Sequence, residues 1–197
     1  MTGKIEKLRA SMTFNMIGAI VVLLAVFGVI VSVLGFVSFT NAFKREYSTS
    51  TYHMAGTAAT LVNGDHLDDY LEGRETEEHL RTQSYLDAYC TAMNVSLVYV
   101  IKVDTTDYGR FVSVFNSVDN SVDDTRYDPW ELGYERDTTN EEYRDKYQAI
   151  YNKEVPYETV YRTKTADRLH PHITTLVPVC GSDGDVTGIL CIQRPIR

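Results

Sequence analysis

The chain has 197 residues, of which 44% are hydrophobic and 23% charged, and its formal net charge is −8 at pH 7. Residues up to Glu46 carry five basic side chains against two glutamates, a net +3, so the remaining residues carry −11. A domain this acidic is poorly suited to nucleic acid or to an anionic membrane surface, because both repel it. The charge is therefore read as a solubilising surface on one compact domain.

An uninterrupted apolar segment, Met16 to Phe39, lies near the start of the chain inside a charge-free stretch from Ala10 to Phe43. That stretch has roughly 34 residues, against the about 20 that a helix needs to cross a bilayer. A buried core helix would not be apolar on every face for this long. The sequence therefore predicts a cytoplasmic N-terminus over residues 1–13, a transmembrane helix over residues 14–40, a membrane-proximal helix over residues 41–63 and an extracytoplasmic domain over residues 64–197.

The orientation is predicted from the charges that flank the apolar segment. Lys4, Lys7 and Arg9 precede it, opposed only by Glu6. Short flanks rich in Lys and Arg stay cytoplasmic, so we expect a single-pass protein of the cell membrane with its C-terminal domain outside. A cleaved secretory signal is the alternative, because residues 40–42 loosely resemble a cleavage site. The apolar segment is, however, far longer than the about 7 to 15 residues of a signal sequence.

The membrane-proximal helix carries a weak pattern for self-association. Six positions follow one another at alternating spacings of four and three, as in the seam of a coiled coil: Phe43, Tyr47, Ser50, Met54, Thr57 and Leu61. Within the membrane, Gly28 and Ser32 form a pair of small residues that lets two helices approach closely. These patterns predict a homodimer through the membrane helix and residues 43–61. Burial of the single helix against its own domain is the alternative.

The outer domain is predicted to mix helices and strands. Asn63-Gly64 is expected to end the long helix, with Gly64 in the left-handed conformation of a C-cap. The patterns that follow predict an amphipathic turn at 67–71, a helix at 75–92, strands at 95–103 and 110–116, a helix at 141–152, and strands at 159–163, 173–179 and 187–193. A polar, acidic segment, residues 117–139 (the excursion), separates the strand at 110–116 from the helix at 141–152.

This order of elements predicts an α+β domain with a five-stranded antiparallel sheet and helices on one side of it. The pocket is then expected on the helix-free face of the sheet, beneath the excursion.

Three cysteines, Cys90, Cys180 and Cys191, fall in the outer domain. An odd number cannot pair fully within one chain. Cys180 and Cys191 flank the same predicted turn at different offsets, so they are not expected to face each other. We therefore expect buried free thiols.

No metal or cofactor is expected. His170 and His172 would share one face of a strand and could chelate a metal, but no carboxylate lies at close spacing. Asp119, Ser121, Asp123 and Asp124 superficially resemble a calcium loop, which lacks here the glycine at its sixth position and the glutamate at its twelfth.

Signatures of catalysis are missing as well. The chain has no GxSxG nucleophile turn and no phosphate-binding glycine loop. The sequence therefore favours a protein that is not an enzyme.

Six polar or aromatic residues are the candidates for binding a small molecule: Tyr99, Trp130, Tyr134, Arg162, His172 and Thr174. Tyr99 is a polar-tipped residue in an otherwise apolar strand, and Trp130 and Tyr134 lie in the excursion that would cap the pocket. Arg162 could hold a carboxylate through two parallel hydrogen bonds. The last two residues of the set share one strand face. Each could instead be an ordinary core or surface residue, and the sequence names no ligand.

Several segments resemble a known family. Leu61–Leu71 (LVNGDHLDDYL), Tyr85–Asp87 and Leu97–Val100 look like the outer sensor of bacterial transmembrane receptors. Thr174–Val179 (TTLVPV) and Ser182–Leu190 (SDGDVTGIL) are similar to the last hairpin of Cache domains. The resemblance covers most of residues 45–193, through the order and spacing of these segments.

The resemblance implies a single Cache domain: a PAS-like sheet, a long membrane-proximal helix and small-molecule binding on the sheet face. It also implies a second membrane helix and a cytoplasmic output domain. Nothing after Lys44 is long and apolar enough to cross back, so the chain is a fragment, or lacks the output, or relies on partners for it. The sequence thus predicts the small-molecule input module of a bacterial signal-transduction receptor. A pilin-like or other membrane-anchored structural protein is the alternative, although the expected prepilin cleavage site is missing.

Overall fold

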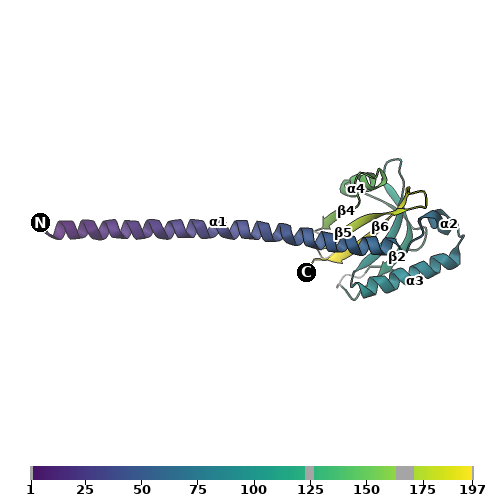
Figure 1. The fold of residues 1–197 in the computed structure, drawn as a ribbon, viewed down its shortest axis with the longest axis horizontal. Coiled ribbons are helices and arrows are strands. Elements are labelled where there is room, and N and C mark those ends of the chain that lie inside the picture. Colours follow the sequence, from purple (N-terminus) through teal and green to yellow (C-terminus); the bar gives the residue numbers. More distant parts are fainter. Residues whose placement is uncertain (1, 123–126, 163–170, 197) are drawn as a thin grey trace. The chain divides into compact units, whose positions relative to one another are not determined.

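The structure is a computed structural model that describes residues 2–122, 127–162 and 171–196, with side chains from residue 12 onward. It divides into two compact units, residues 1–46 and residues 47–197. The first unit is the N-terminal part of α1 (Thr2–Ala59), shown in purple in Figure 1. Within the described residues, one helix is long and apolar enough to cross a membrane, and it is this one. Its Ser32 hydroxyl donates to the Gly28 carbonyl in the same helix at 2.8 Å.

The second unit holds the end of α1 and ten further elements. In chain order these are η1 (Gly64–His66), α2 (Leu67–Leu71), α3 (Thr76–Ala92), β1 (Leu97–Val103), β2 (Arg110–Val118), β3 (Glu135–Asp137), α4 (Glu141–Tyr151), β4 (Glu158–Arg162), β5 (His172–Cys180) and β6 (Val186–Pro195). The strands and helices predicted after residue 63 are all present. The predicted final residue of the strand at 159–163, Thr163, lies outside the described residues.

The strands form one antiparallel sheet in the order β3-β2-β1-β6-β5-β4. The predicted fold class, an α+β domain of PAS-like type behind a long apolar helix, is confirmed, with six strands in place of five. The additional strand, β3, lies inside the excursion and pairs with the start of β2. Its sequence, Glu-Arg-Asp, is exposed throughout, so it carries no alternation from which a strand could be predicted.

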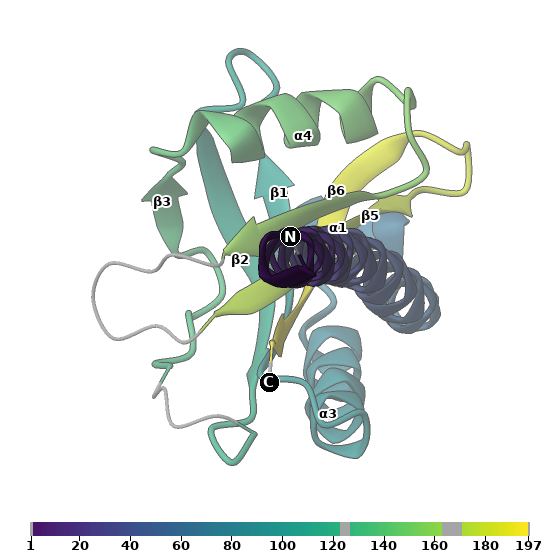
Figure 2. The same ribbon diagram turned by 90° about the vertical axis from the view of Figure 1, so that its left-hand side faces the viewer.

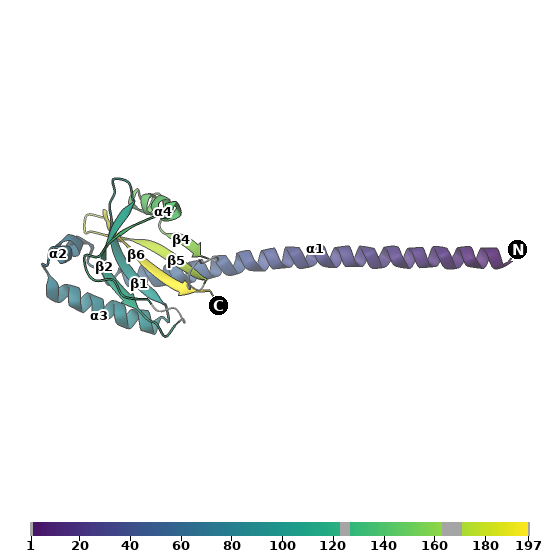
Figure 3. The ribbon, with the colours of Figure 1, turned by 180° about the vertical axis from the view of Figure 1, so that it is seen from behind.

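Helices cover both faces of the sheet, which corrects the expectation of a helix-free face. The end of α1 packs with α2 and α3 on one face. Helix α4 packs on the other face, and Figure 2 shows α3 and α4 on opposite sides of the sheet. Viewed from behind, α3 runs along β1 and β2 (Figure 3). Helix α4 buries Tyr147 and Ile150 against the sheet, and its Lys146 forms an ion pair with Glu158 of β4 at 2.7 Å. Helical periodicity predicts that a helix has a buried side, but not which face of a sheet it covers.

The last turns of α1 belong to the core of the domain. Thr51, Ala55 and Ala58 are fully buried, at the spacings of four and three that place them on one side of the helix. Arg194 of β6 donates to the Thr51 hydroxyl at 3.2 Å, and the Tyr47 hydroxyl donates to the carbonyl of Pro195 at 2.6 Å. The alternative prediction, packing of this helix against its own domain, therefore holds for these turns.

The segment after α1 differs from its prediction. Helix α1 ends at Ala59, and Gly64 is not left-handed; Asn63 instead caps η1 by accepting a hydrogen bond from the Asp65 amide at 3.1 Å. A Cβ atom on Gly64 would lie 2.2 Å from the carbonyl oxygen of Cys180. The glycine is therefore required because the chain passes directly against the end of β5, which sequence alone does not reveal.

The three cysteines are free. Cys90 and Cys191 are buried as expected, whereas Cys180, at the end of β5, is exposed, which corrects the expectation of three buried thiols. Cys180 pairs with Val186 and Cys191 with Leu176, so the two cysteines of the hairpin do not face each other, as predicted.

We predict that Gly64→Ala destabilises the domain by about 1–3 kcal/mol or more, because the added methyl group overlaps backbone that cannot rotate away. Gly56→Ala is the matched control: Gly56 lies in the last turn of α1, and a Cβ atom there meets nothing within 4 Å. It should be neutral or stabilising by up to about 1 kcal/mol, since alanine is the better helix former. Chemical denaturation of both variants in detergent micelles measures the difference. Equal stabilities would contradict the close approach at Gly64.

Candidate ligand-binding site

The register of the sheet brings four of the six candidate residues onto one face. In an antiparallel pair, directly opposite residues point to the same side, and along a strand every second residue does so. Arg162 pairs with His172, and Thr174 follows two residues later on the same strand. Tyr99 lies opposite Cys191, which pairs in turn with Leu176, two residues beyond Thr174. These four candidates therefore share the face covered by α4, here called the α4 face.

Two amide side chains that were not predicted extend this polar set. Asn116 of β2 pairs with Tyr99, and Gln193 of β6 pairs with Thr174, so both lie on the α4 face. Both are buried. Each interrupts an apolar strand at an inward position, and that parity was the signal by which sequence reasoning could have found them.

The amides hold the excursion on the sheet. Asn116 Oδ1 accepts a hydrogen bond from the Trp130 backbone amide at 3.2 Å. Gln193 Nε2 donates to the hydroxyl of Tyr127 at 2.6 Å. The Trp130 ring stands edge-on to the Tyr99 ring, with centroids 5.4 Å apart. Trp130 therefore covers Tyr99.

Tyr134 does not join this group directly. Its side chain is 45% exposed, and its ring stacks on Trp130 with centroids 5.9 Å apart. A surface hollow of about 480 Å³ is lined by residues 128–134, with Trp130 and Tyr134 among them. Tyr134 thus contributes to the outer side of the excursion.

Helix α4 supplies two further tyrosines that sequence reasoning missed. Tyr143 and Tyr147 lie one turn apart, with ring centroids 6.0 Å apart, and both reach the α4 face. Burial raises the pKa of Tyr143, and the nearby Thr174 hydroxyl and Arg162 charge offset part of that rise. Their i, i+4 spacing marks one side of the helix, but nothing in the sequence says that this side meets the sheet.

Burial keeps the hydroxyl and thiol groups of this face protonated. It raises the pKa of Tyr99 and of Tyr147 well above the ordinary value, and that of Cys191 to about 12. Cys191 and Tyr99 lie directly opposite each other on neighbouring strands. A thiol held in this state is no activated nucleophile, because the reactive form is the thiolate. The face is thus suited to donating and accepting hydrogen bonds, with one cation at Arg162.

Two threonine hydroxyls near these tyrosines lack an ordinary hydrogen bond among the described residues: those of Thr174 and Thr138. Both side chains are buried. Each lies close enough to a tyrosine, Tyr143 and Tyr147 respectively, to offset part of the effect of burial on its pKa. A buried polar group without a partner costs about 1–3 kcal/mol. The face therefore has capacity to bond a further polar molecule.

The sequence candidates for metal binding are only partly described. His172 is buried at the start of β5, whereas His170 lies outside the described residues, as do Asp123 and Asp124 of the loop that resembles a calcium site. Asp119 Oδ1 accepts hydrogen bonds from the amide and the hydroxyl of Ser121, at 2.9 and 2.6 Å. The Asp119 carboxylate therefore already accepts hydrogen bonds within its own turn.

Comparison with known proteins finds likeness in fold alone. No protein-family model matches the chain, and no curated protein matches it. The ligand-binding domain of the Campylobacter jejuni chemoreceptor Tlp3, in complex with 4-methylisoleucine, is similar with a TM-score of 0.42 and 14% identity. The alignment covers 77% of this chain and 52% of that one, so the chain spans about half the length of that domain.

Two further structures are similar at lower scores. The periplasmic sensory domain of the Campylobacter jejuni chemoreceptor Tlp1 has a TM-score of 0.35 at 12% identity, over 77% of this chain and 57% of its own. The inducer-binding domain of the transcription factor PobR from Acinetobacter, complexed with 3-hydroxybenzoic acid, has a TM-score of 0.35 at 16% identity, over 57% and 80%. Chemoreceptor sensory domains are the class that the sequence motifs resemble.

We predict that the domain unfolds cooperatively in alkali, together with ionisation of its buried tyrosines. The folded-state pKa of Tyr99 and Tyr147 lies above the unfolded value of about 10. Their contribution to stability is therefore complete below about pH 10 and is lost as the pH rises through the folded-state pKa.

Denaturation at a series of pH values, with tyrosinate absorbance recorded alongside, measures this effect. Tyr99→Phe should make the fall of stability above about pH 10 shallower. Tyr134→Phe, at an exposed side chain, is the control and should leave it unchanged. An equally steep fall in Tyr99→Phe would contradict the burial of the Tyr99 hydroxyl.

Proposed function

We propose that this chain is the membrane-anchored, extracytoplasmic input module of a bacterial signalling receptor, and that its domain binds a small molecule on the α4 face. The observation that carries the proposal is the set of buried polar side chains on that face. Tyr99, Asn116, Thr174 and Gln193 are all buried there, although this side of the sheet could have been closed by apolar residues alone. Buried polar side chains in proteins are nearly always hydrogen-bonded, so a face that keeps several of them is suited to binding a polar partner.

The chemistry of the side chains on the α4 face indicates the class of ligand. Arg162 offers a cation with several donors at one end of the face, beside His172. Hydroxyl groups of threonine and tyrosine lie next to it, and aromatic rings cover the far end. A small polar molecule with a carboxylate group would meet the guanidinium at one end and the rings at the other. No cofactor and no catalytic step is part of the proposal.

The anchor supplies the remainder of the proposal. An apolar helix long enough to span a bilayer precedes the domain, and the basic N-terminal flank favours a cytoplasmic N-terminus. A ligand that binds one state of the domain more tightly shifts the population toward that state. Because the last turns of α1 are buried in the same domain, such a shift would move the helix that leads to the membrane.

We predict that the full chain in detergent micelles binds a member of a panel of amino acids, hydroxy acids and aromatic carboxylic acids. Arg162→Gln should weaken that binding by about 10-fold or more, because a hydrogen-bonded charge contributes about 1.5–3 kcal/mol. Thr174→Val should weaken it less. Arg110→Gln, at an exposed ion pair on β2, is the control and should bind as the unaltered chain does.

Isothermal calorimetry with the strongest member of the panel measures all four proteins. Binding that persists unchanged in Arg162→Gln would move the site away from the α4 face. A panel in which no compound binds would count against the proposed ligand class.

We also propose that the protein is a homodimer through the membrane helix and residues 43–61. The side of α1 that carries Thr51, Ala55 and Ala58 packs on its own sheet and is not free for a partner. Thr57 is exposed, and Leu61, which follows the helix, is 36% exposed. The seam predicted from the sequence thus keeps an exposed side that a second copy could cover.

Disulfide crosslinking in membranes tests the dimer. In a Cys180→Ser background, Thr57→Cys should crosslink to a second chain on oxidation. Ala58→Cys, one residue later and fully buried, is the matched control and should not. Crosslinking of the control and not of Thr57→Cys would contradict the proposed side of the helix.

A further inference from the structure

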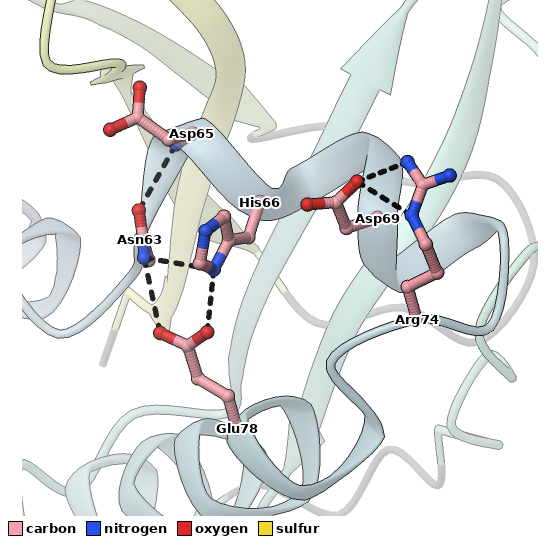
Figure 4. Close-up of polar contacts among 6 residues, drawn as sticks. All are labelled: Asn63, Asp65, His66, Asp69, Arg74 and Glu78. Carbon is pink, nitrogen blue, oxygen red and sulfur yellow. Dashed lines mark hydrogen bonds and ion pairs between the residues drawn. The ribbon is translucent and has the colours of Figure 1, made fainter.

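A cluster of metal-ligating side chains lies on the opposite side of the sheet from the α4 face. His66 comes from η1, Glu75 directly precedes α3, and Glu78 lies in the first turn of α3. One ligand atom of each residue lies within 4.8 Å of those of the other two. His66 Nδ1 and Glu78 Oε2 are 2.6 Å apart (Figure 4).

These separations are close to those of a metal site. With metal–ligand bonds of about 2.0–2.2 Å in tetrahedral geometry, ligand atoms lie about 3.4 Å from one another. The distance between His66 Nδ1 and Glu78 Oε2 would grow by roughly 0.8 Å, and the ligand atom of Glu75 would have to approach by at most about 1.4 Å. Glu75 is exposed, so its side chain can turn without disturbing the core.

The carboxyl group of Glu78 is already held in place. Asn63 Nδ2 donates to Glu78 Oε1 at 3.1 Å, and Asn63 is itself fixed by its cap on the Asp65 amide (Figure 4). In metal sites, groups of this kind orient the ligands and set their affinity.

Tyr70 provides an independent indication of a missing partner. Its side chain is only 1% exposed, and among the described residues its hydroxyl has no hydrogen-bond partner. The ring stands at 90° to that of His66, with centroids 6.2 Å apart. The hydroxyl lies near the Glu78 carboxylate, but not in the geometry of an ordinary hydrogen bond. Water bound to a metal at the cluster would give this buried donor its partner.

We propose that His66, Glu75 and Glu78 form a binding site for a divalent transition-metal ion of the zinc class, with water at the fourth position beside Tyr70. The mixed set of one imidazole and two carboxylates selects such an ion over calcium, which takes six to eight oxygen ligands. Asn63 positions Glu78 and does not touch the ion.

The site would act on the segment that follows the membrane-proximal helix. Asn63 and His66 lie at the cap and the end of η1, the first element after α1, whereas Glu75 and Glu78 lie at the start of α3. A bound ion would therefore fasten the end of α1 to α3, on the side of the sheet away from the α4 face. It would make the stability of this junction depend on metal concentration, by mass action. This inference does not depend on the ligand proposed above.

Zinc binding to the full chain in detergent micelles tests the proposal, by competition with a chromophoric chelator. The measurements use a Cys180→Ser background without an affinity tag, because Cys180 is an exposed thiol. We expect one zinc ion per chain and no competition from calcium. His66→Gln and Glu75→Gln should each weaken binding by about 10-fold or more. Cobalt should bind at the same site, and its visible spectrum should lose intensity in both variants.

Asp69→Asn is the matched control. Asp69 is a neighbouring carboxylate that pairs with Arg74 instead of the cluster, as Figure 4 shows, so its loss should leave zinc affinity unchanged. Glu75 is exposed, which allows Glu75→Gln to fold even if a change at His66 does not. Stoichiometric binding that survives both His66→Gln and Glu75→Gln would overturn the proposal. So would the lack of any zinc binding, or equal competition by calcium.

Discussion

The packing of the last turns of α1 against the sheet is the interaction on which the rest of the domain depends. Thr51, Ala55 and Ala58 have small side chains, so the helix backbone lies close to the strands and no large residue separates them. The helix that follows the apolar segment is for this reason a component of the domain core. Covering one face of the sheet in this way leaves the other face for α4 and the excursion, where the buried polar residues are found.

Strand β6 connects the two faces within two consecutive residues. Gln193 points to the α4 face and donates to Tyr127 in the excursion, while Arg194 points to the other face and donates to Thr51 in α1. A displacement of β6 would therefore move both the excursion and α1, because each side chain is fixed to its partner by a hydrogen bond. This is one short physical route between the proposed ligand site and the end of α1.

Much of the fold could be predicted from the sequence, because its strands and helices have strong local patterns. Val98 to Val103 is recognisable as a strand by composition alone, and the apolar segment by its length. The short strand β3 could not be found, since three exposed charged residues carry no pattern. The role of Gly64 could not be predicted from the sequence either, because it depends on the carbonyl of Cys180, more than 100 residues away in the chain.

The candidate site was predictable to a similar degree, and for a similar reason. Tyr99, Thr174 and His172 stood out as polar residues within or beside strands, and parity along each strand is a local property. Tyr143 and Tyr147 were missed because their contribution depends on which face of the sheet α4 covers. The cluster around His66 was missed because it joins two helical segments whose approach is set by tertiary packing.

Hydrogen exchange of the full chain in micelles tests the central claim most directly, namely that the end of α1 is built into the core of the domain that follows it. Regions of one cooperative unit open with the same free energy. We expect the backbone amides of residues 51–59 to be as strongly protected as those of 98–101 in β1 and 189–192 in β6. Exchange at residues 51–59 that is orders of magnitude faster than in the sheet would contradict it. Residues 51–59 would then be a helix structurally independent of the sheet, and a ligand bound on the α4 face would not be coupled to it directly.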